Sequence, residues 1–236
     1  MERIGQKDNF IAKHAKIATV VAVIFGSTSG ILGNLITAPA LAIGFWRLAI
    51  ALPFFIIPAV ADREKRHKLK GISKKDYILC FISGAFLFGH YFSWFNAVKL
   101  TNVASASVLA ALHPLVVLLV TVFVYRRKVS LRSVLAIIVA LLGGVLIMGA
   151  DYSTFAGGNI TGNIFAFFAA VFMGLYFAMG DEVRKRVDGG LYVLLVFASC
   201  WICFIIGNIA SGTELLGYRP MDYVYLIVMA FVCQIG

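Results

Sequence analysis

Residues 103–124 read VASASVLAALHPLVVLLVTVFV, and the basic stretch YRRK follows at positions 125–128. A helix needs about 20 predominantly apolar residues to cross the hydrocarbon core of a bilayer. Residues 103–124 reach that length without an acidic or basic side chain, and Arg and Lys clustered after a span are typical of its cytoplasmic end. The stretch therefore predicts a helix that lies in a membrane.

Other parts of the chain have the same character. Apolar runs of comparable length occupy residues 17–36, 40–60, 77–98, 133–150, 162–180 and 191–210, and an eighth run extends from Asp222 to residue 236. The runs are continuously apolar rather than alternating, which favours helices over the strands of a β-barrel. We therefore predict an all-α polytopic membrane protein. Because the eighth run ends without a polar or basic flank, we expect the chain to be a fragment of a longer protein.

The composition excludes an ordinary soluble protein. Hydrophobic residues make up 61% of the chain and charged residues 14%, whereas soluble domains average about 45–50% and ~25%. The net charge of +10 could indicate nucleic-acid binding, but the basic residues form short clusters between apolar runs. Cys200 and Cys203 form a C-x-x-C pair inside an apolar run, without the second ligand pair of a metal site. We expect no nucleic-acid partner, no metal and no cofactor.

The placement of basic residues predicts the orientation. With the N-terminus in the cytoplasm, the inner segments are the N-terminus and residues 62–76, 126–132 and 183–188. These segments hold all but three of the 21 Lys and Arg residues, the exceptions being Arg47, Lys99 and Arg219. Because cytoplasmic loops are enriched in Lys and Arg, we predict a multi-pass protein of the cytoplasmic membrane with its N-terminus inside.

A weak similarity between two short segments of the sequence indicates an internal repeat. Residues 23–26 read VIFG, and residues 171–174 read VFMG. The two segments are five spans apart, so a repeat unit of five helices would enter the membrane from the opposite side the second time. Inverted repeats of this kind are a common architecture among secondary transporters.

Several motifs resemble those of a known family in their order and spacing. They are FGS at 25–27, FWRLA at 45–49, ASASVL at 104–109 followed by Pro114-Leu115, and LGGVLI at 142–147. In these features the chain resembles the EamA-like branch of the drug/metabolite transporter superfamily. One departure is that the family often has Gly-Glu-Arg after the fourth helix, where this chain has YRRK without a Glu. A role of that Glu is therefore not transferred to this chain.

The resemblance implies ten helices arranged as an inverted five-plus-five repeat. On that plan, residues 1–150 are the first EamA-like repeat, with five spans and the N-terminus inside. Residues 151–236 are an incomplete second repeat of about three spans, so the fold would be truncated after about eight helices.

Polar residues within the spans are the candidates for a substrate pathway, because a polar group at membrane depth is costly unless it is paired or hydrated. The candidates are Ser27, Asn34, Arg47, His90, Trp94, His113 and Tyr176. Ser27 and Asn34 share a face of the first span, which could line a central cavity or pack against another helix. Tyr176 in the sixth span is the better cavity candidate, because its hydroxyl needs a partner.

Arg47 and the two histidines each allow two interpretations. Arg47 lies about a third of the way into the second span, where it could contact a substrate carboxylate or extend to headgroups at the outer interface. His90 and Trp94 share a helical face, as in a cavity wall, but His90 could equally bond to a neighbouring helix with Trp94 in the interface belt. His113 precedes Pro114, which frees a carbonyl one turn back and predicts a kink, either at a gating or binding point or in packing alone.

These features favour a secondary transporter or exporter of a small metabolite, amino-acid-like or drug-like, that works by alternating access. The sequence has no G-x-x-x-x-G-K-[ST] motif for ATP binding. The alternative is an integral membrane enzyme acting on lipid or isoprenoid substrates, which would need clustered acids, histidines or metal ligands. His90 and His113 are isolated in the sequence, so we expect no enzyme. The expected partners are a small-molecule substrate and the lipid bilayer, and a homodimer is left open.

Overall fold

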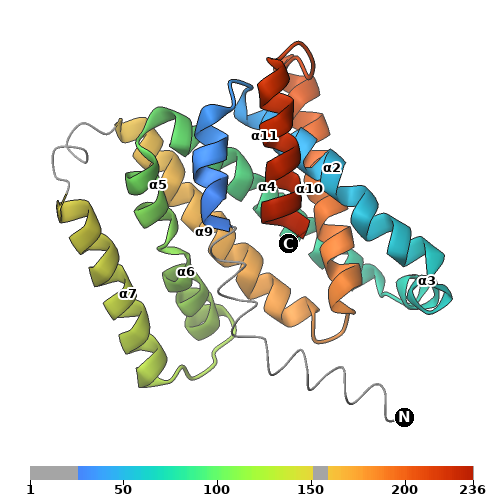
Figure 1. Ribbon diagram of the computed structural model, residues 1–236. Coiled ribbons are helices and arrows are strands. Elements are labelled where there is room, and N and C mark those ends of the chain that lie inside the picture. The colour runs from blue at the N-terminus through green and yellow to red at the C-terminus, as the bar shows by residue number, and fades with distance from the viewer. Residues whose placement is uncertain (1–25, 151–158, 236) are drawn as a thin grey trace, which may run out of the picture.

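The computed structural model describes residues 26–150 and 159–235 of the chain. Within these two ranges the chain is helical and contains no strand, which confirms the predicted all-α fold (Figure 1). After a helix over residues 26–35, the elements are α2 (Ala40–Ala61), α3 (Arg63–Lys70), α4 (Lys74–Leu100), α5 (Val103–Ala110), α6 (His113–Leu119), the π-helix η1 (Val120–Val124), α7 (Leu131–Ala150), α9 (Ile160–Val183), α10 (Gly189–Ser211), α11 (Pro220–Ala230) and the π-helix η2 (Phe231–Ile235).

Five helical segments of the described ranges are long and apolar enough to cross a bilayer. They coincide with five of the predicted spans and are Ala40–Ala61, Lys74–Leu100, Val103–Val124, Ile160–Val183 and Gly189–Ser211. Two further predicted runs correspond to α7 and to α11 with η2, each of which contains a shorter apolar helix. The predicted run at 17–36 begins outside the described residues. The polytopic membrane architecture is therefore confirmed.

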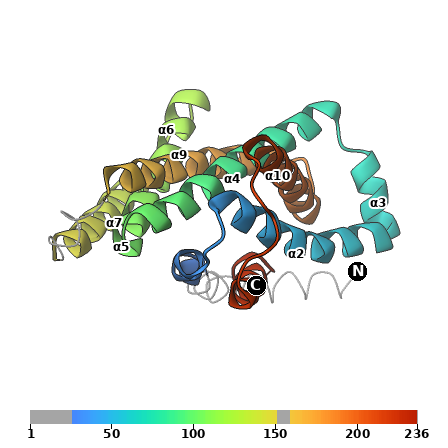
Figure 2. The same cartoon turned by 90° about the horizontal axis from the view of Figure 1, so that it is seen from above.

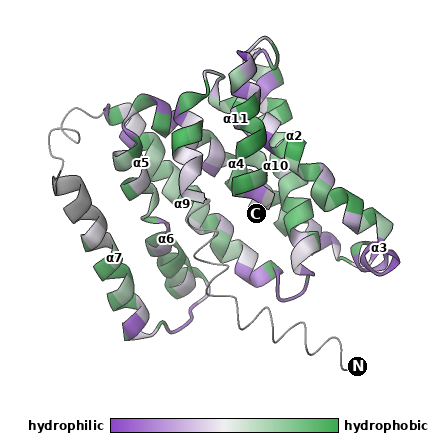
Figure 3. Ribbon diagram, viewed as in Figure 1, coloured by the Kyte–Doolittle hydropathy of each residue, from purple (hydrophilic) through white to green (hydrophobic). Residues whose placement is uncertain are grey.

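The outer surface of the helices is apolar. The large side chains of Ile57, Phe123 and Ile209 are 65%, 73% and 77% exposed. Figure 3 shows hydrophobic residues along the long helices, whereas hydrophilic residues gather on α3 and near the helix ends. A surface of this kind fits the hydrocarbon core of a bilayer, which solvates apolar side chains but not polar ones.

Polar side chains mark where the helices begin. The hydroxyl of Ser73 accepts a hydrogen bond from the backbone N–H of Asp76 at the start of α4. Asn102, Asn159 and Asp188 cap α5, α9 and α10 in the same way. Each such cap satisfies an N–H group that has no partner inside its helix and typically contributes about 1 kcal/mol. The caps therefore define the turns between spans.

The helix α4 lies at the centre of the bundle and packs against α9, α10 and α2. Figure 2 shows α4 running alongside α9, with the helix at 26–35 and α11 on one side of this pair and α6 on the other. The helix α7 lies at the edge of the molecule (Figure 1). Segments far apart in the sequence thus meet along α4.

Glycines allow the helices around α4 to approach closely. A Cβ atom added at Gly84 of α4 would lie 2.7 Å from the carbonyl oxygen of Val196 in α10. A Cβ atom at Gly174 of α9 would lie 2.9 Å from the carbonyl oxygen of His113 at the start of α6. Because lipid supplies little hydrophobic driving force between helices, such close backbone packing is a main source of association in a membrane.

Replacing Gly84 with alanine is expected to weaken the contact between α4 and α10. The added methyl group would meet backbone atoms, which cannot move without shifting the helix, and overpacking costs about 1–3 kcal/mol. Gly143→Ala in α7 is the matched control, because a methyl group there meets no described atom within 4 Å. Thermal unfolding in detergent should show a midpoint lowered by roughly 4 °C or more for Gly84→Ala. Equal midpoints for the two variants would contradict the close contact.

Candidate substrate pathway

Arg47 of α2 is held inside the bundle, where its side chain is only 4% exposed. Its Nε donates to Oε1 of Gln234 at 2.6 Å, its Nη1 to Oγ of Ser29 at 3.2 Å, and its Nη2 to the carbonyl oxygen of Cys233 at 3.3 Å. The guanidinium carbon also lies 4.6 Å from the centre of the Tyr91 ring. The side chain is therefore fixed between the helix at 26–35, α4 and η2, and it does not extend to the headgroups.

Gln234 of η2 accepts hydrogen bonds from both Arg47 and a second residue. Its Oε1 also accepts a hydrogen bond from the hydroxyl of Tyr91 at 3.1 Å. Because a guanidinium only donates hydrogen bonds, the amide oxygen and not the amide nitrogen must face Arg47. The amide nitrogen of Gln234 is buried and has no hydrogen-bond partner among the described residues.

His90 of α4 is tied to the neighbouring helix α9. Its Nδ1 lies 2.9 Å from the carbonyl oxygen of Ala169. A carbonyl oxygen only accepts, so Nδ1 carries a hydrogen and donates it to this oxygen. Trp94 lies one turn further along α4 and packs on the helix at 26–35, where a Cβ atom at Gly30 would be 3.0 Å from the indole. The contacts of His90 match the interpretation of a histidine bonded to a neighbouring helix.

The fourth span is interrupted at the predicted position. The helix α5 ends at Ala110, and α6 begins at His113 with Pro114 in its first turn. Proline has no N–H to offer the carbonyl oxygen of Ala110. The ring of His113 takes that role, with Nδ1 at 3.0 Å from this oxygen. The histidine therefore repairs the hydrogen bond that the proline removes, and its ring lies 5.5 Å from that of Phe177 in α9.

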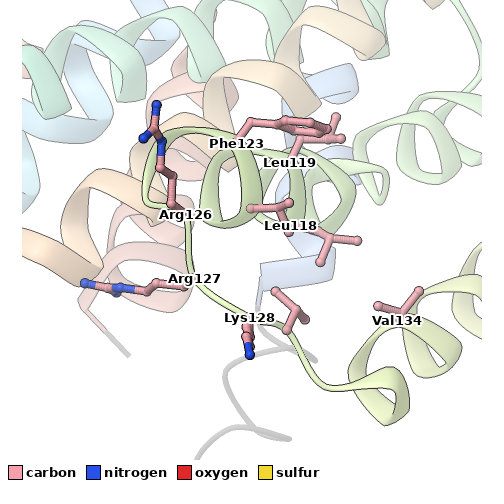
Figure 4. A pocket seen from close by; sticks show the side chains of 9 residues that line it. Leu118, Leu119, Phe123, Arg126, Arg127, Lys128 and Val134 are labelled. Atoms are coloured by element: carbon pink, nitrogen blue, oxygen red, sulfur yellow. The ribbon is translucent and has the colours of Figure 1, made fainter.

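Two grooves lie beside this interruption. One has a volume of about 400 Å³ and is lined by His113, Pro114 and Thr121 together with Phe177 of α9 and Ser133 of α7. The second has a volume of about 710 Å³ and lies between η1, the YRRK loop and α7 (Figure 4). The side chains of the three basic residues in this loop diverge from one another in Figure 4, so they do not form a converging anion site.

The remaining candidates are Ser27, Asn34 and Tyr176. Ser27 and Asn34 are exposed on the helix at 26–35. Tyr176 is half-buried in α9, and its ring lies 5.3 Å from that of Phe177, which in turn contacts His113. The structure thus brings Tyr176 near His113 through Phe177, while Arg47 belongs to a different cluster.

Three members of the Arg47 cluster were missed in the sequence analysis: Ser29, Tyr91 and Gln234. Gln234 carried a usable signal, because it is a polar residue within the otherwise apolar eighth run. Tyr91 and Ser29 carried none, since tyrosine and serine are common in spans and only their partners distinguish them. We refer to Arg47, Ser29, Tyr91 and Gln234 as the arginine cluster.

The two ends of the bundle carry separate polar networks. At one end, Oδ1 of Asp76, the third residue of α4, accepts from Nε and Nη2 of Arg186 at 3.0 and 2.8 Å. Arg186 belongs to the loop between α9 and α10, and hydrogen bonding to Asp76 raises the pKa of its guanidinium. At the same end, Nη2 of Arg127 lies 2.5 Å from Oε1 of Glu182 at the end of α9. We call these contacts the inner network, after the orientation that the sequence predicts.

The outer network lies at the opposite end of the bundle and involves other helices. Asp222, the third residue of α11, accepts from the backbone N–H of Thr37 at 3.2 Å and from its hydroxyl. Thr37 belongs to the loop between the helix at 26–35 and α2. Arg219 binds Oδ1 of Asp222 at 3.0 Å and the carbonyl oxygen of Leu35 at 3.1 Å. The Asp222 side chain is fully buried.

The two networks have the same design at different positions in the chain. In the inner network, an aspartate at the start of the third span binds the loop between the sixth and seventh spans. In the outer network, an aspartate at the start of the eighth span binds the loop between the first and second spans. A shift of five spans converts each network into the other.

Comparison with known proteins identifies similar chains. A family model described as "EamA-like transporter family" matches residues 15–149. The "Uncharacterized transporter YxxF" of Bacillus subtilis (strain 168) is 30% identical over 186 residues, which cover 76% of this chain. The chain spans 59% of the length of that relative. A solved crystal structure with 18% identity matches 94% of this chain and 76% of its own chain with a TM-score of 0.69, which shows a shared fold.

Replacing His113 with alanine is expected to destabilise the protein only while Pro114 is present. The His113→Ala variant leaves the carbonyl oxygen of Ala110 without its partner, at a cost of about 1 kcal/mol. In a Pro114→Ala background, the new backbone N–H can reach that oxygen, so the same histidine change should cost much less. Thermal unfolding of the four proteins in this double-mutant cycle gives the coupling. An equal effect of His113→Ala in both backgrounds would show that the ring does not replace the lost bond.

Proposed function

Because the chain belongs to the EamA-like transporter family, we propose that the protein carries a small molecule, amino-acid-like or drug-like, across the cytoplasmic membrane by alternating access. The proposal treats residues 1–150 as one half and residues 151–236 as part of a second, inverted half. Substrate would bind between the halves, which rock about it.

The observation that carries this proposal is the exchange of partners between the inner and outer networks. An inverted repeat places equivalent contacts at opposite faces of the membrane. The Asp76–Arg186 and Asp222–Thr37 contacts are such a pair, and each joins the third helix of one half to the first loop of the other. Contacts of this kind can close one end of a pathway while the other end opens.

The strength of the inner network is compatible with repeated opening. The Arg186 and Asp76 side chains are 47% and 11% exposed, and partly exposed ion pairs contribute about 1 kcal/mol or less. The glycine-mediated contacts along α4, by contrast, join backbones directly. We infer that the ends open and close while the packing along α4 persists.

The sidedness also belongs to the proposal. The inner network links the YRRK loop, the α9–α10 loop and the start of α4, all of which carry clustered basic residues. Basic loops that meet at one end support a cytoplasmic position for that end, with the N-terminus on the same side.

Reporter fusions should place the two ends in different compartments. A reporter fused after Lys70, in the basic segment before α4, is expected to be active in the cytoplasm. A reporter fused after Gly212, between α10 and α11, is expected to be active on the external side. Alkaline phosphatase and green fluorescent protein report the two compartments with opposite signals. Activity of both fusions on one side would contradict the proposed topology.

Cross-links across either network should stop transport. The full-length gene product, with its native cysteines replaced, would carry Asp76→Cys with Arg186→Cys, or Thr37→Cys with Asp222→Cys. Proteoliposomes would be tested for flux of a radiolabelled amino-acid mixture and of ethidium before and after a short bifunctional thiol reagent. Each cross-link is expected to abolish flux, because alternating access needs both ends to open in turn.

The matched control carries Glu64→Cys with Lys68→Cys, a pair that lies within α3 and does not join the halves. Its cross-link should leave flux unchanged. Flux that persists when either network is locked would contradict alternating access. Absence of flux for both probes in the uncross-linked protein would contradict the transport proposal itself.

A further inference from the structure

The arginine cluster contains more hydrogen-bond donors than acceptors. The guanidinium of Arg47 has five N–H groups, and its Nε, Nη1 and Nη2 each have one recorded acceptor. The oxygen of Gln234 is occupied by two donors, from Arg47 and Tyr91. The amide nitrogen of Gln234 adds two N–H groups that are buried without a described partner. An additional acceptor at this position would satisfy donors that the described residues leave over.

The cluster also carries an uncompensated charge. Arg47 has only neutral acceptors, and no described carboxylate forms an ion pair with it. Asp76 and Asp222, which lie in the flanking helices α4 and α11, are engaged in the end networks. A buried guanidinium is costly without an anion, and removal of one partner from a buried pair typically costs several kcal/mol. The site is therefore electrostatically complementary to a single negative charge.

The position of the cluster is that of a shared site between the halves. Arg47, Ser29 and Tyr91 come from α2, the helix at 26–35 and α4, whereas Gln234 comes from η2. These segments converge at η2, which follows α11 and whose Gln234 bonds to Arg47 of α2 and to Tyr91 of α4. A ligand bound to both Arg47 and Gln234 would bridge the two parts of the repeat.

We propose that Arg47 and the amide nitrogen of Gln234 bind the carboxylate of the transported molecule, so that the substrates are small monocarboxylates without a free amino group. The proposal rests on the proposed transport function. Tyr91 and Ser29 act as positioning residues, because Tyr91 holds the Gln234 oxygen and Ser29 holds Nη1 of Arg47.

The chemistry favours a carboxylate over a phosphate. A planar guanidinium matches the two oxygens of a carboxylate, and an amide N–H can donate to the same group. One buried cation balances one negative charge, whereas a phosphate dianion would leave a net charge inside the bundle. An uncharged amide analogue offers one acceptor oxygen and brings N–H donors of its own to a site that already has too many.

Thermal unfolding of the full-length gene product in detergent tests the site without measuring transport. The probes are propionate, benzoate and N-acetylated amino acids, each compared with its amide, and inorganic phosphate. At least one carboxylate should raise the unfolding midpoint, and its amide and phosphate should not. In Arg47→Gln, the carboxylate concentration for half-maximal stabilisation should rise about 10- to 100-fold. Lys128→Gln, which removes an exposed cation from the YRRK loop, should leave it unchanged.

A second variant keeps the test decisive if Arg47→Gln does not fold. Gln234→Glu places a carboxylate of the same shape against Arg47, so the protein should unfold at a higher temperature than the unmodified chain and lose its response to carboxylates. A purely structural role for Gln234 predicts that the response survives.

The outcomes separate this inference from the transport proposal. Flux of ethidium without stabilisation by any carboxylate would overturn the carboxylate site and leave the transporter intact. Equal stabilisation by an acid and its amide, or an undiminished response in Gln234→Glu, would also overturn it. Stabilisation by carboxylates without flux of any probe would uphold the site and count against transport.

Discussion

A polar group inside a bilayer must find its partner within the protein, because no water is available there. The fourth span shows this constraint in the backbone. Pro114 cannot bond to the carbonyl oxygen of Ala110, and the ring of His113 supplies the missing donor. The span can therefore bend without leaving a buried carbonyl unsatisfied. The same histidine borders a groove beside α9, so the repair of the helix and the shape of that groove depend on one residue.

The constraint also organises the buried side chains. Lys99 donates a hydrogen bond to the carbonyl oxygen of Ile36 at 2.6 Å. Arg47 donates hydrogen bonds to Gln234 of η2 and to Ser29 of the helix at 26–35. Each of these bonds joins parts of the chain that lie far apart in the sequence. Polar groups thus connect specific helices, whereas the apolar surfaces around them would allow many relative positions. The arginine cluster departs from this rule because its donors outnumber its acceptors, and it is the proposed ligand site for that reason.

The middle and the ends of the helices are held together by different kinds of contact. Close backbone packing at Gly84 and Gly174 holds the centre of the bundle together. The ends are held by the ion pairs and hydrogen bonds of the inner and outer networks. The proposed inverted repeat would turn one such contact into two, namely Asp76 with Arg186 and Asp222 with Thr37. This arrangement supports the proposed alternation between two open ends.

The sequence alone was enough to predict the five spans found in the described residues, the interruption at Pro114 and the family, because hydropathy, proline chemistry and motif order are properties of neighbouring residues. It also marked Arg47 and the histidines as polar groups at membrane depth. It left the surroundings of Arg47 open, since burial and headgroup contact are equally compatible with one arginine in an apolar run. Only the tertiary structure decided that Gln234, 187 positions away, and Tyr91 are its partners. The physical reason is that a hydrogen bond depends on where two distant segments meet, and apolar periodicity does not encode that meeting point.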